Sequence, residues 1–100
     1  MKRFDISKAK TLRGEIIKNL YDLYDEPIPL NRIMDLMRYK TFYDKRDIKR
    51  AIGYLSGIKK EFVQVEADDK EYWASFVQLT PKGVNLAEGD ISDMGVVFSE

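Results

Sequence analysis

Residues 45–50, KRDIKR, carry the densest group of side chains in this chain that can bind an anion. Pairs of cations recur four positions apart, so a helix would place them side by side on one exposed face: Lys45, Arg46, Lys49 and Arg50. Arginine can bind a guanine edge through two hydrogen bonds, and lysine can meet a phosphate. The competing interpretation is that these cations form only the solvated face of an ordinary charged helix.

The residue types that are missing remove several other kinds of chemistry. The chain has no histidine and no cysteine, which excludes Ser-His-Asp and Cys-His catalysis, histidine or cysteine metal sites and disulfides. No pair of carboxylates stands out as an acid and a base. The acidic segment 66–71 lacks the ligand spacing of an EF-hand. We therefore expect no enzyme activity, no cofactor and no metal site.

Charge is divided unevenly along the chain, although the formal net charge is zero. Residues 1–60 hold 15 Lys and Arg against 8 Asp and Glu, whereas residues 61–100 hold 2 against 9. This asymmetry indicates an anionic partner for one surface only. The length of 100 residues predicts one domain. With no apolar run of eighteen residues and no signal-peptide pattern, we expect no membrane span and a cytoplasmic location.

The basic segment lies in a predicted helix that begins after Asp44. Asp44 is a good N-cap, and Asp47 suits the positive end of the helix dipole. Gly57 and the Lys59-Lys60 pair end the helix. Its buried face is predicted to contain Ile48, Ala51, Ile52, Leu55 and Ile58.

Two helices precede it. The first is predicted after Ser7 as far as Tyr24, and the second from about Arg32 to Arg38 after an Asn31 cap. Apolar residues at helical spacing form the core stripe of the first helix: Leu12, Ile16, Leu20 and Leu23. Gly14 lies within that helix, where glycine costs roughly 1 kcal/mol relative to alanine. It marks either a poorly optimised turn or the close approach of another backbone.

Two strands, predicted at residues 62–66 and 72–79, form a β-hairpin, and a short extended piece around Ile28 can add a third strand. Thr80 is then predicted to cap a last short helix that begins at Pro81. A phosphate-binding loop is the other interpretation of this segment, but such a loop would need more glycines. The predicted fold is α+β, a winged helix-turn-helix with three helices, a β-hairpin wing and a short C-terminal helix. Residues 1–89 form the domain, and residues 90–100 form a tail.

The span 12–89 resembles bacterial winged-helix regulators, including small phage-encoded or prophage-encoded members described as ArsR-like. The segment LTPKGVNLAEG after the hairpin carries most of the resemblance, because an LTxKGxxL-type segment follows the wing in many of them. The segment GDISDMGV resembles the prophage tail, except that Met94-Gly95-Val96 stands where Pro-Gly-Val is common. The cysteines and histidines of metal-sensing ArsR proteins are absent, so metal regulation is not implied.

This resemblance implies a transcriptional regulator that places its third helix in the major groove of double-stranded DNA. The predicted contacts are Arg38, Lys40, Thr41, Tyr43, Lys45, Arg46, Lys49 and Arg50. The predicted hairpin tip, residues 66–71, has a net charge of −3 and would repel DNA phosphates. Either the wing points away from DNA, or the domain is a winged-helix module that binds another protein instead.

Winged-helix regulators usually act as two-fold dimers, so we also expect a homodimer. Its interface is predicted to use Ile17, Tyr21 and Tyr24 of the first helix together with the apolar tail, because large exposed apolar patches mark contact surfaces. The alternative is that the tail folds back and covers the first helix within one chain.

Overall fold

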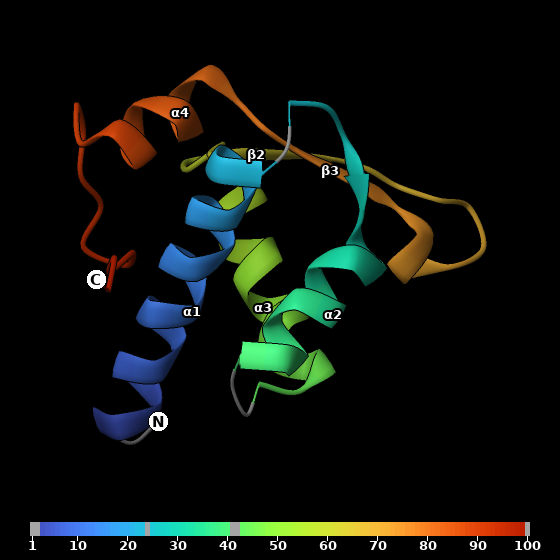
Figure 1. The fold of residues 1–100 in the computed structure, drawn as a ribbon, viewed down its shortest axis with the longest axis horizontal. Coiled ribbons are helices and arrows are strands. Elements are labelled where there is room, and N and C mark those ends of the chain that lie inside the picture. The colour runs from blue at the N-terminus through green and yellow to red at the C-terminus, as the bar shows by residue number, and fades with distance from the viewer. Residues whose placement is uncertain (1–2, 24, 41–42, 100) are drawn as a thin grey trace.

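The computed structural model describes residues 3–23, 25–40 and 43–99, with residues 3–5 and 38–40 described by their backbone alone (Figure 1). This part of the chain contains both helices and strands. Their order is α1 (Arg3–Leu23), β1 (Ile28–Pro29), α2 (Leu30–Lys40), α3 (Lys45–Ser56), β2 (Val63–Glu66), β3 (Phe76–Leu79) and α4 (Pro81–Glu88). A 3₁₀ turn, Tyr72–Ala74, lies between β2 and β3. The fold is therefore α+β, as predicted.

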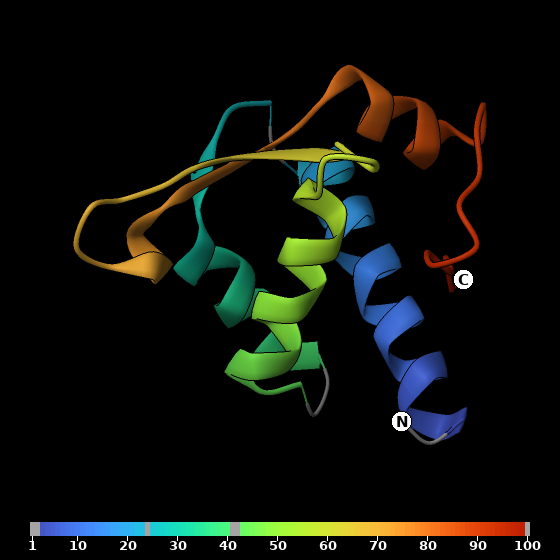
Figure 2. The same cartoon turned by 180° about the vertical axis from the view of Figure 1, so that it is seen from behind.

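The three strands form one antiparallel sheet in the order β1-β3-β2. Val77 on the central strand is paired with Val65 of β2 and with Ile28 of β1. The hairpin and the third strand near Ile28 are thus confirmed. Figures 1 and 2 show β2 and β3 crossing one end of the bundle of α1, α2 and α3, with α4 near the same end of α1.

The core lies where α3 meets α1, α2 and the sheet. Helix α3 buries Ile48, Ala51, Ile52 and Leu55, all of which were predicted. Burying one large aliphatic side chain contributes roughly 1.5–3 kcal/mol, so this face anchors the helix. The facing surfaces are also aliphatic, and they include Leu12, Ile16, Ile17 and Leu20 of α1, Ile33 and Met37 of α2, and Val63 and Val77 of the sheet.

Local capping signals predict two helix starts correctly. The Asp44 carboxylate accepts a hydrogen bond from the Asp47 amide at 2.9 Å, and the Asp47 carboxylate accepts one from the Asp44 amide at 3.2 Å. At α4, the Thr80 hydroxyl accepts from the Gly83 amide at 3.0 Å, and Pro81 is the first helical residue. Both starts depend on contacts within four residues, which is why sequence reveals them.

Two other predicted helix starts are wrong. Helix α1 begins at Arg3, which leaves Ser7 inside it. Helix α2 begins at Leu30, whose amide donates to the Ser75 carbonyl oxygen at 2.8 Å. A hairpin carbonyl, and not the Asn31 side chain, therefore satisfies that amide.

Two residues predicted in the core are exposed. Leu23 is 57 % exposed at the end of α1, and Ile58 is 90 % exposed. Helix α3 ends at Ser56 and Gly57 continues in extended conformation, so Ile58 leaves the helical face on which it was placed. The second hairpin strand is also shorter than predicted and begins at Phe76, because residues 72–74 turn as a 3₁₀ helix.

The segment 90–99 runs back along α1 (Figure 1). The Val97 amide donates to the Lys10 carbonyl oxygen at 3.1 Å, and the Arg13 guanidinium donates to the Gly95 carbonyl oxygen at 2.9 Å. A Cβ atom on Gly14 would lie 1.9 Å from the Val97 carbonyl oxygen. Gly14 therefore marks the close approach of another backbone, the second of the two interpretations.

This course of the tail corrects the predicted dimer interface. Ile17 is fully buried within its own chain and cannot form part of a contact surface. Tyr21 is exposed, and its hydroxyl donates to the Glu88 carboxylate at 2.6 Å. Tyr24 lies outside the described residues. The tail covers part of α1, as the single-chain alternative expected, and dimer formation itself stays a prediction.

The two glycines inside helices provide a matched test of this packing. Gly53 of α3 has open space where a Cβ would lie, whereas Gly14 does not. We expect Gly53→Ala to raise the free energy of unfolding by about 1 kcal/mol, through helix propensity. Its Tm should rise by roughly 4–8 °C, measured by circular dichroism. Gly14→Ala should lower Tm, because its methyl group displaces the tail.

Truncation after Gly89 provides the control for this pair. Without the tail, Gly14→Ala should stabilise its parent as Gly53→Ala does. An equal gain from both substitutions in the full chain would show that the tail does not pack against Gly14.

Candidate functional site

The exposed side of α3 is strongly basic. Because the opposite side is buried, the rotation of the helix about its axis is fixed and its cations face outward. We call this surface the basic face of α3; its exposed members are Lys45, Arg46, Lys49, Arg50 and Gly53. The four cations thus lie on one exposed side of α3, as the sequence predicted. Gly53 leaves the helix backbone uncovered beside them, because nothing lies within 4 Å of its Cβ position.

Lys49 connects the basic face to the hairpin. Its ammonium lies 4.7 Å from the centre of the Tyr72 ring, and Tyr72 meets Trp73 edge to face at 5.0 Å. Tyr72 is half-buried, and a cation over an aromatic ring contributes at least roughly 0.5–1 kcal/mol, the value for exposed sites. Burial of Tyr72 raises the pKa of its hydroxyl. Lys49 is thereby held in place while its side chain stays exposed.

The other predicted contacts do not all join this face. Thr41 lies outside the described residues, and Arg38 and Lys40 are placed only as backbone in the last turn of α2. Tyr43 is half-buried and lies toward α1, with the Lys8 ammonium 5.3 Å from its ring centre. Burial, followed by the nearby carboxylates of Glu15 and Asp47, raises the pKa of Tyr43. Its ring therefore packs between α1 and α3 and is not presented on the basic face of α3.

The acidic loop of the hairpin uses part of its charge to hold its own shape. The Asp68 carboxylate accepts hydrogen bonds from the amides of Lys70 and Glu71 at 3.1 Å and 2.9 Å. The Glu71 carboxylate accepts from the Trp73 amide at 3.3 Å and begins the 3₁₀ turn. Two of the acids that argue against DNA binding at the tip thus have a structural role.

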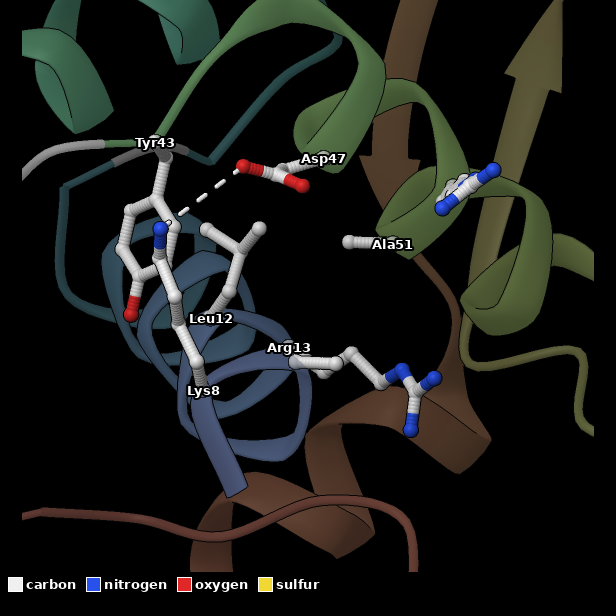
Figure 3. A pocket seen from close by; sticks show the side chains of 8 residues that line it. Lys8, Leu12, Arg13, Tyr43, Asp47 and Ala51 are labelled. Atoms are coloured by element: carbon white, nitrogen blue, oxygen red, sulfur yellow. Dashed lines mark ion pairs between the residues drawn. The ribbon is translucent and has the colours of Figure 1, made fainter. Parts of the chain in front are cut away.

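Sequence reasoning missed a hollow of about 350 Å³ between α1 and α3. Figure 3 shows Lys8 and Tyr43 on one side of it, Arg13 on the other, and Leu12 and Ala51 between them. A weak signal was present, because Lys8 and Leu12 are one helical turn apart on α1 and Arg13 is adjacent. Nothing in the sequence indicated that α3 would lie opposite these residues.

A polar cluster around Tyr54 holds the tail against α3 and α1. The Tyr54 hydroxyl donates to the Asp93 carboxylate at 2.5 Å, and the Lys60 ammonium donates to the same carboxylate at 2.8 Å. The Arg13 guanidinium stacks on the Tyr54 ring at 3.9 Å. A Cβ on Gly95 would lie 2.1 Å from the Tyr54 hydroxyl oxygen, so this glycine permits the contact.

The charges of this cluster stabilise one another. Burial raises the pKa of Asp93, but hydrogen bonds from Lys60, Tyr54 and Gly95 outweigh it and hold the pKa below its ordinary value of 3.8. The hydrogen bond to Asp93 is the main cause that raises the pKa of Lys60 above 10.5. The lowered acid pKa stabilises the fold above pH 3.8, and the raised lysine pKa stabilises it below pH 10.5.

Comparison of this chain with protein-family models, curated proteins and solved structures finds no match in any of the three. Within the part of the chain that the structure describes, no three acidic side chains gather as possible metal ligands. No helix in that part is long and apolar enough to span a bilayer.

The Asp93 cluster predicts a characteristic dependence of stability on pH. Asp93→Asn keeps the shape of the side chain and removes its charge, so we expect Tm to fall by roughly 4 °C or more near neutral pH. The difference from the original chain should shrink as pH falls through the lowered pKa of Asp93, since both proteins are then uncharged at this position. Thermal unfolding between pH 2.5 and pH 8 measures it.

Asp69→Asn is the matched control, because Asp69 is an exposed acid in the hairpin loop. Its effect on Tm should be small at every pH. If Asp93→Asn and Asp69→Asn gave the same pH profile, the cluster would not stabilise the fold through charge.

Proposed function

We propose that this domain is a winged helix-turn-helix that binds double-stranded DNA and acts as a transcriptional regulator. The order of elements supports it, with a short strand before α2, α3 as the next element after α2, and a hairpin whose second strand pairs with that first strand. The observation that carries the proposal is the basic face of α3. Four cations and an uncovered backbone lie on the helix that this fold class inserts into DNA.

The face has suitable dimensions and chemistry for a major groove. The groove is about 12 Å wide and admits one α-helix. Arg46 and Arg50 lie one turn apart on the exposed side, where either guanidinium can donate two hydrogen bonds to guanine. Lys45 and Lys49 flank them and suit phosphates. Gly53 allows the helix axis to lie closer to the bases than a larger side chain would.

The structure describes the remaining predicted contacts to different extents. Arg38, Lys40 and Thr41 stay predictions for the DNA backbone. Tyr43 moves out of the proposed interface because its ring is half-buried between helices. A two-fold dimer also stays a proposal, and its interface must exclude Ile17.

The alternative function is a module that docks another protein through the hairpin. Glu66 and Asp69 are exposed there, and Phe76, which is paired with Glu66 across the hairpin, is 46 % exposed. An acidic edge with an exposed aromatic ring suits a basic protein surface. The basic face of α3 would then have no role in the interaction.

The salt dependence of DNA affinity tests the proposal. Fluorescence anisotropy with a random-sequence duplex should show affinity falling steeply between 50 mM and 200 mM salt, with about −0.9 in log–log slope for each phosphate neutralised. Lys49→Ala should flatten the slope by about one unit. Lys18→Ala, which removes an exposed cation from α1, is the matched control and should leave the slope unchanged. A salt-insensitive affinity, or none at low salt, would favour the protein-docking module.

A substitution at Gly53 separates folding from binding. Gly53→Glu places a carboxylate in the middle of the basic face, in open space and with better helix propensity than glycine. We expect Tm to be kept or raised and DNA affinity to fall at least about tenfold, through charge repulsion. Asn85→Glu adds the same charge on the exposed side of α4 and should change affinity much less. Equal effects of the two substitutions would place the DNA elsewhere.

A further inference from the structure

The hollow between α1 and α3 has two kinds of lining. Its apolar part comes from Leu12 and Ala51, which are buried, and from the half-buried ring of Tyr43. Its charged part includes Lys8, Arg13 and Arg50. The volume of about 350 Å³ lies at the small end of the range for sites that bind organic molecules. Space of this size fits a compound with a single ring.

The charged lining favours one negative charge. Asp47 is the carboxylate in the lining, and the Lys8 ammonium lies 3.9 Å from it (Figure 3). With three cations against one carboxylate, the lining has a net charge of +2. Among the described residues, neither Arg13 nor Arg50 lies within salt-bridge distance of a carboxylate. Because Lys8 and Asp47 offset each other, two guanidinium groups remain, and together they can bind one carboxylate.

Arg13 is positioned before any ligand arrives. Its guanidinium is stacked on the Tyr54 ring and donates to the Gly95 carbonyl oxygen, so its plane is fixed. Its Nε atom is buried and has no hydrogen-bond partner. A molecule in the open hollow cannot reach this buried atom, so a ligand would have to use the terminal nitrogens of the guanidinium. A guanidinium held in one plane suits a carboxylate, which accepts hydrogen bonds in the same planar geometry.

From this geometry we propose that the hollow binds a small organic monocarboxylate with a flat apolar body. The carboxylate lies between Arg13 and Arg50, and the ring lies over Leu12 and Ala51 beside Tyr43. This site does not depend on DNA binding. It shares Arg50 with the basic face of α3, so an occupant would also reduce the positive charge available there.

Benzoate is the probe for this site, and benzamide is its neutral counterpart of the same shape. Both are titrated into the full chain at constant ionic strength and followed by ¹H–¹⁵N correlation spectra. Benzoate should cause saturable shifts in the amides of Leu12, Arg13 and Ala51, with an affinity at least about tenfold higher than that of benzamide. Equal affinities, or no saturation below about 20 mM benzoate, would overturn the proposal.

Three variants locate the binding. Arg50→Gln should weaken benzoate roughly three- to tenfold by removing one guanidinium. Ala9→Leu, at a half-buried position of the lining, should fill the space and weaken benzoate and benzamide alike. Lys18→Gln removes an exposed cation outside the lining and should have no effect. If Lys18→Gln weakened benzoate as much as Arg50→Gln, the anion would be held by general surface charge and the proposal would be wrong.

Discussion

Ile48, Ala51, Ile52 and Leu55 pack on one side of α3, and their burial determines how the rest of the molecule is arranged. Each of the three larger side chains contributes roughly 1.5–3 kcal/mol, whereas an exposed ion pair contributes about 0–1 kcal/mol. Burial of the apolar side therefore determines the rotation of the helix about its axis, and the cations lie on the opposite side, which faces solvent. The same contact gives α1, α2 and the sheet a common surface, so the basic face and the hollow both follow from it.

The tail adds a second constraint, which operates through backbone and charge more than through apolar area. Gly14 and Gly95 have no side chains where neighbouring atoms lie too close for a Cβ. The Arg13 guanidinium stacks on the Tyr54 ring, and the Tyr54 hydroxyl donates a hydrogen bond to the Asp93 carboxylate. Helix α3, α1 and the tail are thus joined at one aromatic side chain. This junction also fixes the guanidinium that borders the hollow, so the order of the tail and the geometry of the hollow are connected.

The fold could be predicted from sequence wherever the deciding contacts are local. Asp44 and Asp47 cap α3 within four residues, and apolar spacing identifies its buried face, so the four cations were correctly grouped. The start of α2 has a distant cause, because the Ser75 carbonyl oxygen, and not Asn31, accepts the hydrogen bond of the Leu30 amide. Ile58 was placed in the core although α3 ends at Ser56, and it lies in solvent. The hollow needs Arg13 and Arg50 from different helices, and no periodicity in one segment can indicate that meeting.

The return of the tail to α1 has a consequence for the order of folding. Arg13 and Gly95 are 82 positions apart, whereas the Phe62 amide donates to the Leu55 carbonyl oxygen only seven positions away. Closing a long loop costs more chain entropy than closing a short one, and distant contacts form slowly. The α3–β2 corner can therefore form early, and the tail docks last. Until the tail docks, Gly14 is not covered by Val97 and the Arg13 guanidinium lacks the Gly95 carbonyl oxygen.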